Sequence, residues 1–143
     1  MPLKINVKSG EKFVVNGAVM VAGNKGASLV LQNEATILLG KDVMQESEAT
    51  TPSRRIYFSI LVMYLDQENV NKYRDTFMSY VEDFMDATTF SEVRRTLLHI
   101  VEDVNSKNYY RAMKTCKALM TYEDEMLKVG KKEAQLEAAH VGN

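Results

Sequence analysis

Apolar and polar residues alternate along the first 40 positions of the chain, which is the pattern of strands with one buried face. Leu3, Ile5 and Val7 alternate with polar residues in this way. Asn16-Gly17 stands between two such segments and is a strong signal for a two-residue hairpin turn. The pattern ends at Ile37–Leu39 and predicts about five short strands in a small antiparallel sheet or roll. A sheet of this size cannot bury both faces alone, so it must pack on helices, on a second copy, or on both.

After Pro52 the apolar residues recur every three or four positions, which is the spacing of helices. Thr51-Pro52 predicts a helix start, because threonine caps free backbone N–H groups and proline fits the first turn. Residues 56–65 are apolar on nearly all sides and predict a central helix. Asn105-Ser106 is expected to separate the third helix from the fourth.

Two further polar positions are expected to begin helices. Asp66 can cap the second helix, and Thr89 with Glu92 three residues later has the spacing of a capping box for the third. The segment after Gly130 is polar and rich in alanine, which predicts a frayed helix or a disordered tail.

These patterns predict an α+β fold, in which a small N-terminal antiparallel β-sheet or roll precedes a C-terminal bundle of about four helices. We expect a β-rich part at residues 1–50, a helical part at 51–128, and a flexible or frayed helical tail at 129–143.

The composition is typical of a globular protein, with 45% hydrophobic and 26% charged residues among 143. No apolar run reaches the roughly 20 residues that span a bilayer, and the N-terminus lacks the pattern of a secretory signal. We therefore expect a cytoplasmic protein that does not contact membranes. The single cysteine, Cys116, excludes a disulfide within the chain and a cysteine-based zinc site.

Catalytic signals are weak. His99 lies off the apolar stripe of its helix, His140 lies in the tail, and no nucleophile or glycine-rich phosphate motif is present. Glu123-Asp124-Glu125 would fan around a helix rather than converge on a metal ion. We expect these carboxylates to form a solvated face or a docking site for a basic partner. The sequence thus predicts no enzyme, no cofactor and no metal site.

Four segments of the chain resemble one known family. They are EATTPSRRIYF with the following MYLD, the opening PLKINVKSGEKFVVNGAV, the run LVLQNEATILLGKDVMQ, and YYRAMKTCKALMTYEDEML. Together they are similar to the FlbT family of flagellar regulators from about residue 2 to residue 127. The resemblance implies a protein that regulates flagellin synthesis after transcription, through the 5′ untranslated region of flagellin mRNA. It does not fix whether that regulation is negative or positive.

A net charge of −1, from 18 Lys and Arg against 19 Asp and Glu, is unusual for a protein that binds RNA. Such binding is driven by contacts of cations with phosphates. The basic residues must therefore gather on one surface, or a partner must assist. We expect folding to gather them.

Arg54 and Arg55 are the first candidates, because they lie near a predicted helix N-terminus, where anions are favoured. Adjacent helical residues diverge by about 100°. One arginine is therefore expected to face an anion, and the other to pair with a carboxylate such as Glu48 or Asp66. Alternatively, both attach the β half to the helices.

Two further groups of cations are candidates for RNA contact. Lys107, Arg111 and Lys114 have the spacing of one basic ridge on the last helix, which is either a phosphate-binding surface or only a solvated face. Lys4 and Lys8 lie in a segment weakly similar to the first strand of CsrA-type translational regulators. There they either contact RNA or protect a strand edge from aggregation.

Two functions follow from these observations. The first is a post-transcriptional regulator that binds the flagellin mRNA leader and modulates its translation and decay. The second is an adaptor or chaperone-like protein that binds flagellin or the companion regulator FlaF through an apolar, methionine-rich groove. Free sheet edges also make a homo-oligomer plausible through the β-sheet edge.

Overall fold

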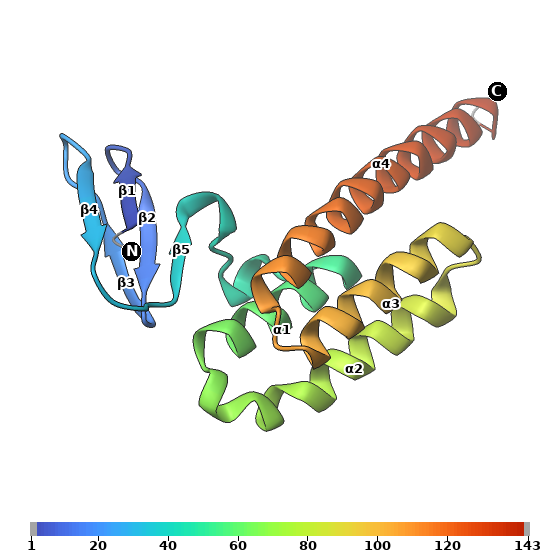
Figure 1. The fold of residues 1–143 in the computed structure, drawn as a ribbon. Helices are drawn as coiled ribbons and strands as arrows, with labels where there is room; N and C mark the ends of the chain where they lie inside the picture. The colour runs from blue at the N-terminus through green and yellow to red at the C-terminus, as the bar shows by residue number, and fades with distance from the viewer. Residues whose placement is uncertain (1–2, 142–143) are drawn as a thin grey trace.

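The computed structural model describes residues 3–141, which form a β half followed by a helical half (Figure 1). The expected α+β fold is confirmed. The strands are β1 (Leu3–Val7), β2 (Lys12–Val15), β3 (Ala18–Val21), β4 (Ala27–Leu31) and β5 (Ile37–Leu39). The helices are α1 (Pro52–Leu65), α2 (Val70–Ala87), α3 (Ser91–Asn105) and α4 (Tyr109–Val141). Short 3₁₀ turns occupy Gly40–Asp42, Glu46–Glu48 and Gln67–Asn69.

The strands form two small antiparallel sheets rather than one. β1 pairs with β4, and β2 lies between β3 and β5. The predicted hairpin is present, with Asn16 and Gly17 at φ values of 49° and 83°, as a tight turn between antiparallel strands requires. The sheets share a small core of Val7, Phe13 and Ala22. On the other side of β2, Val14 belongs to the main core that the helices form.

The start of α1 is confirmed as the Thr51-Pro52 pair predicts. The Thr51 hydroxyl accepts a hydrogen bond from the Arg54 N–H at 3.3 Å, and Pro52 occupies the first turn. The helix is central, because it packs against both α2 and α4. Its fully buried side chains include Ile56, Ile60 and Met63. Residues 56–65 therefore lie in a central helix, as their apolar character predicts.

The two other predicted caps are wrong. Asp66 precedes a 3₁₀ turn, and its carboxylate accepts hydrogen bonds from the Asn69 side chain and the Tyr73 hydroxyl instead of from free N–H groups of α2. At α3 the capping position is Phe90, one residue later than expected, so Thr89 lies outside it. The Thr88 hydroxyl instead accepts the Phe90 N–H at 3.3 Å.

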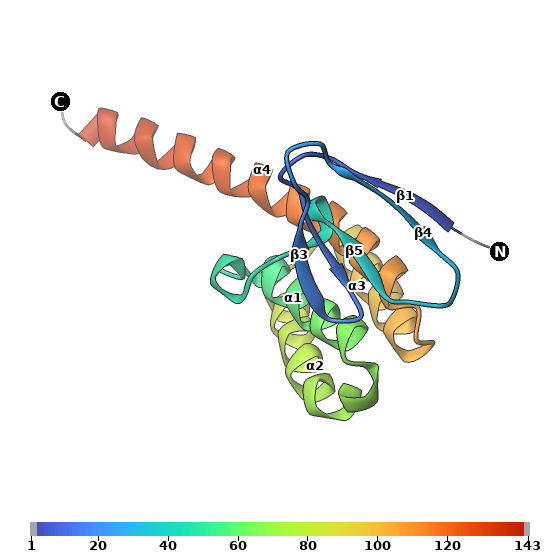
Figure 2. The same ribbon diagram turned by 90° about the vertical axis from the view of Figure 1, so that its left-hand side faces the viewer.

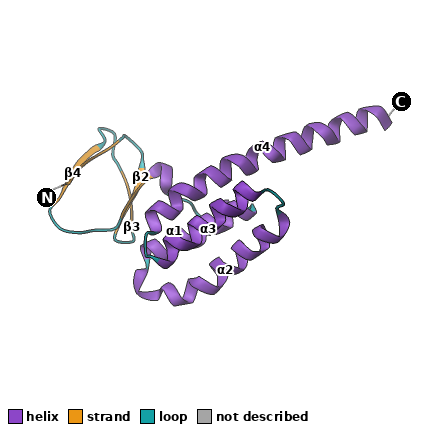
Figure 3. Cartoon of the chain, turned by 45° about the vertical axis from the view of Figure 1, so that its right-hand side comes forward, coloured by secondary structure: helices purple, strands orange, loops and turns teal. Residues whose placement is uncertain are grey.

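The last helix, α4, has 33 residues and extends well past the other helices (Figures 2 and 3). Its first half packs against α1 and α3. The segment expected to be frayed or disordered continues the helix to Val141, while positions 142 and 143 of that segment lie outside the described residues. Within residues 3–141, no helix combines the length and apolar character needed to cross a bilayer.

Candidate nucleic-acid interface

Arg54 is occupied by contacts within the protein. Its guanidinium donates hydrogen bonds of 2.9 and 3.0 Å to the two carboxylate oxygens of Asp124, in α4. It also lies 3.5 Å from a carboxylate oxygen of Glu123. The expected partners, Glu48 and Asp66, are therefore wrong. The hydrogen bond from Arg54 holds the pKa of the Asp124 carboxyl below its usual range.

The carboxylate of Glu123 is buried against the first turn of α1. It accepts the backbone N–H of Ser53 at 2.9 Å and the Ser53 hydroxyl at 2.8 Å. The expectation of a solvated acidic face is thus wrong for Glu123, which is buried against α1, whereas the Asp124 side chain pairs with Arg54 and is still 45% exposed. Glu125 alone of the three is exposed and unpaired among residues 3–141. We call Ser53, Arg54, Glu123 and Asp124 the interhelix cluster.

Arg55 points away from the interhelix cluster. It is exposed and lines a separate pocket of about 550 Å³ together with Phe58, Tyr73 and Tyr80. Within the described part of the chain it forms no salt bridge. One arginine of the pair therefore joins α1 to α4, and the other remains available to a ligand.

Three of the candidate cations line one cleft beside two tyrosines. Lys107, Arg111 and Lys114 border a hollow of about 520 Å³ together with Tyr64 and Tyr110. Lys107 does not belong to α4, contrary to the predicted helical ridge. It lies in the preceding turn in a left-handed conformation, with φ of 63°. We call the hollow between these five residues the tyrosine cleft.

The two rings of the tyrosine cleft supply the aromatic surface that the strands lack. The centroids of Tyr64 and Tyr110 lie 6.1 Å apart at an interplanar angle of 41°. The Lys114 ammonium lies 5.1 Å from the Tyr110 ring centroid, and Tyr110 is 41% exposed. Sequence reasoning missed these rings because it sought exposed aromatics in the strands. The direct succession of Tyr110 and Arg111 was an available signal, since bases stack on aromatic side chains next to cations.

Two carboxylates moderate the charge of the cleft. An oxygen of Asp103 lies 3.9 Å from the Arg111 guanidinium, and one of Asp42 lies 3.8 Å from the Lys114 ammonium. Both distances are at the limit of an ion pair, and Arg111 is mostly exposed. The exposed Arg111 pair contributes little in water, and the Lys114 side chain is 43% exposed beside the buried Asp42, so both cations can still reach an anion. A hydrogen bond with Tyr110 raises the pKa of Lys114, which stays protonated.

Asp42 is a buried residue that the sequence analysis did not identify. Its carboxylate accepts hydrogen bonds from the Lys117 ammonium and, at 3.2 Å, from the Tyr110 hydroxyl. Its backbone carbonyl accepts the Tyr57 hydroxyl at 2.6 Å. Because Asp42 ends the 3₁₀ turn that follows β5, these bonds attach the β half to α1 and α4 beside the tyrosine cleft.

An apolar groove continues from the cleft toward the strands. Leu3 and Ile5 of β1 line it together with Tyr64 and Tyr110, and its volume is about 350 Å³. Side chains alternate across a strand, so Lys4 points to the opposite face of β1. Lys8 lies just past the end of that strand. The expected gathering of all candidate cations on one surface is therefore wrong: three share a cleft, and the other four lie elsewhere.

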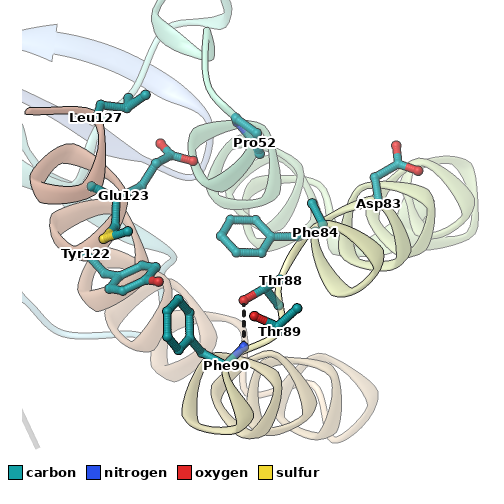
Figure 4. Close-up of a pocket in the computed structure, with 11 residues that line it drawn as sticks. Pro52, Asp83, Phe84, Thr88, Thr89, Phe90, Tyr122, Glu123 and Leu127 are labelled. Carbon is teal, nitrogen blue, oxygen red and sulfur yellow. Dashed lines mark hydrogen bonds between the residues drawn. The ribbon is translucent and has the colours of Figure 1, made fainter. Parts of the chain in front are cut away.

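A second groove lies between the α2–α3 connection and α4 (Figure 4). The rings of Phe90 and Tyr122 meet edge to face, with centroids 6.3 Å apart. Phe84 and Leu127 complete an apolar lining around a volume of about 380 Å³. The sequence analysis expected such a groove between helices but could not place it.

Other chemistry has little support in the geometry. His99 is exposed, and the side chain of His140 lies outside the part that the structure describes. Cys116 is fully buried, and burial raises the pKa of its thiol. Among the described residues, no cluster of three or more His, Cys, Asp or Glu side chains could hold a metal ion.

Comparison of the sequence with known proteins finds similarity to a known family. Residues 3–127 match the family described as flagellar protein FlbT. The probable flagellum biosynthesis repressor protein FlbT of Caulobacter sp. (strain K31) is 42% identical over 127 residues, which cover 89% of this chain and 97% of that protein. The corresponding protein of Caulobacter vibrioides (strain ATCC 19089 / CIP 103742 / CB 15) is 42% identical over 89% of this chain and 90% of its own. That of Chelativorans sp. (strain BNC1) is 32% identical over 92% and 90%. No solved structure matches the chain.

Proposed function

Because the chain belongs to the FlbT family of flagellar proteins, we propose that it regulates flagellin synthesis by binding the 5′ untranslated region of flagellin mRNA. Relatives that match nearly the whole chain carry the name of flagellum biosynthesis repressor, which supports a regulatory role. Binding of the leader modulates translation and decay of the message. The protein acts in the cytoplasm and without catalysis of its own.

The observation that carries this proposal is the composition of the tyrosine cleft. Single-stranded RNA is recognised by cations that contact phosphates and by aromatic rings that stack on bases. Lys107, Arg111 and Lys114 surround Tyr110 in that arrangement. The cleft has a volume of about 520 Å³, and Tyr110 is 41% exposed to solvent.

The charges of the cleft also indicate how steeply the binding depends on salt. Only three cations line it, and Arg111 and Lys114 each lie near a carboxylate. Each phosphate contact on a single strand contributes about 0.7 to the slope of log affinity against log salt. The slope for this cleft is therefore about 2, smaller than that of a strongly basic RNA-binding protein. Unpaired leader nucleotides are the expected ligand.

The test is a gel-shift titration of a flagellin mRNA leader at several salt concentrations. The triple variant K107Q/R111Q/K114Q should weaken binding and remove most of the salt dependence. The double variant K4Q/K8Q is the matched control, since it removes exposed cations outside the cleft and should bind as the unaltered protein does. Absence of binding, or equal losses in both variants, would show that the cleft is not the RNA site.

The apolar groove at Phe90 and Leu127 favours a second candidate function, an adaptor that binds a helical segment of flagellin or FlaF. Pull-down of purified flagellin or FlaF after nuclease treatment separates this function from the first. Leu127→Glu should abolish the complex. Leu98→Glu, at a similarly exposed leucine of α3 outside the groove, should retain it. A complex that nuclease destroys would reject the adaptor.

A further inference from the structure

The strand β3 differs from every other strand within residues 3–141, because all of its side chains are exposed. Val19 and Val21 expose 66% and 61% of their surface. Its sequence, Ala-Val-Met-Val, contains no charged or polar residue. The strand also forms one edge of its sheet, since the order is β3-β2-β5. Natural edge strands usually carry charges, proline or a cover that prevents further pairing, and β3 has none of these.

The backbone of β3 presents free hydrogen-bonding groups at this edge. Ala22 exchanges bonds with the β2 side, as its N–H donates to the Glu11 carbonyl and its carbonyl accepts the Gly10 N–H, both at 3.0 Å. Bonded and non-bonded residues alternate along an antiparallel strand. Met20 and Ala18 therefore bond to β2, whereas the N–H and C=O groups of Val19 and Val21 point away from it.

We propose that β3 pairs antiparallel with β3 of a second copy of this chain, across a two-fold axis at Met20. In this register Val19 lies opposite the partner's Val21 and exchanges backbone hydrogen bonds with it on each side of the axis. Met20 meets the partner's Met20 as a non-hydrogen-bonded pair. The sheet then continues from one copy into the next in the order β5-β2-β3-β3-β2-β5.

A second copy fits this edge because the edge is complementary to itself. The four valines gather on one face of the joined sheet, and the two methionines gather on the other. No charged side chain of β3 is brought against its own copy, so no like-charge repulsion opposes the pairing. An isologous contact of this kind closes as a dimer.

The other edges are less suited to pairing. β1 carries Lys4, and the outer side of β5 is covered by Tyr64, whose hydroxyl donates to the Ile37 carbonyl at 3.4 Å. β4 buries its alternate side chains in part. The contact at β3 is short, and small interfaces are weak. We therefore expect a dimer whose population rises with protein concentration.

Sedimentation velocity over a concentration series tests the proposal on the purified chain, without RNA, so the outcome is independent of the proposed function. A species of twice the 16.2 kDa chain mass should appear as concentration rises. Val19→Lys should abolish it, whereas Val30→Lys, at an exposed valine of β4, should not. Adding Val21→Glu to Val19→Lys should restore the dimer, because the register sets position 19 against position 21. A monomer at all concentrations, or a dimer unchanged by Val19→Lys, overturns the proposal.

A cysteine cross-link tests the same register without a change of charge. Non-hydrogen-bonded partners in antiparallel strands have Cα atoms about 4.5 Å apart, within the range that a disulfide can join. Met20→Cys should therefore give a covalent dimer under mild oxidation, and Val30→Cys should not. The native Cys116 is fully buried and does not compete. Equal cross-linking of both variants, or none of Met20→Cys, would reject the pairing. Stable capture of an unrelated extended peptide by a monomeric chain would likewise reject the second copy as occupant.

Discussion

The carboxylate of Glu123 in α4 accepts both the backbone N–H and the hydroxyl of Ser53 in the first turn of α1, although 70 residues separate the two in the chain. A free N–H at the start of a helix is normally satisfied by a nearby residue. Here the last helix supplies the acceptor. Two of the segments that carry the family resemblance, one containing Ser53 and one containing Glu123, are therefore in direct contact in the fold.

Replacing Glu123 by alanine should lower the free energy of unfolding by about 1–3 kcal/mol, because it leaves buried donors of Ser53 without an acceptor. Urea denaturation followed by circular dichroism measures the change. Glu125→Ala is the matched control, since that carboxylate is exposed, and it should stay within about 0.5 kcal/mol of the unaltered protein. Equal effects of the two substitutions would show that the Ser53 contacts are not stabilising.

The pair formed by Arg54 and Asp124 should make the free energy of unfolding depend on pH in the acid range. Its hydrogen bond lowers the pKa of the folded-state carboxyl, so the unfolded state takes up a proton first as the pH falls. The stabilisation is therefore complete above the unfolded pKa of about 3.9 and is lost as the pH falls through the lower folded value. The difference in unfolding free energy between the unaltered protein and Asp124→Asn should be constant near neutrality and shrink below about pH 4. In an Arg54→Met background this acid dependence should disappear. A difference that stays constant down to pH 3 would contradict the assignment.

Asp42 should prove important for the attachment of the β half. Asp42→Ala removes the acceptor for Lys117 and Tyr110 and should destabilise the protein by about 1–3 kcal/mol. Hydrogen exchange of the β5 amides should also accelerate. Asp103→Ala serves for comparison, because its pair with exposed Arg111 is long and such pairs contribute at most about 1 kcal/mol. If Asp103→Ala costs more than Asp42→Ala, the attachment lies elsewhere.

Two substitutions at Tyr110 separate its ring from its hydroxyl. Tyr110→Ala removes the stacking surface and should weaken leader RNA binding about tenfold or more, since a stacked base contributes about 1–3 kcal/mol. Tyr110→Phe keeps the ring and removes the hydroxyl contacts to Asp42 and Lys114, and it should bind nearly as the unaltered protein does. Fluorescence anisotropy with a labelled leader fragment gives both affinities. Equal weakening by both variants would point to the hydroxyl contact rather than to stacking.

Local features of the fold, which depend only on residues adjacent in the chain, could be predicted from the sequence. The Asn16-Gly17 hairpin and the Thr51-Pro52 helix start are set by local backbone preferences, and both are present. The α3 start shows the limit of such rules. A capping box works only if its threonine is the N-cap residue of the helix. The N-cap of α3 is Phe90, one residue after Thr89, so Thr89 cannot form the box.

Contacts between distant segments were not predictable from local patterns. Periodicity places Glu123 and Asp124 on the rim of an apolar stripe but does not state which helix that rim meets. The pairing of Arg54 depends on the crossing of α1 and α4. Lys107 adopts a left-handed turn that its residue type does not favour. The tyrosine cleft was therefore predicted only in part: its cations were identified from the sequence, and its rings were not.

The long helix α4 touches α1 at two separated levels, Tyr110 against Tyr64 at one end and Glu123 against Ser53 at the other. Two separated contacts fix the position of α4 along the antiparallel α1, whereas a single contact would let the helices pivot. Sliding α4 by a single residue would shift it about 1.5 Å and turn it about 100°, and both contacts would break together. Any displacement of α4 that separates the rings at one end must therefore also disturb the carboxylate contact at the other, so the two contacts together fix the axial alignment of the bundle.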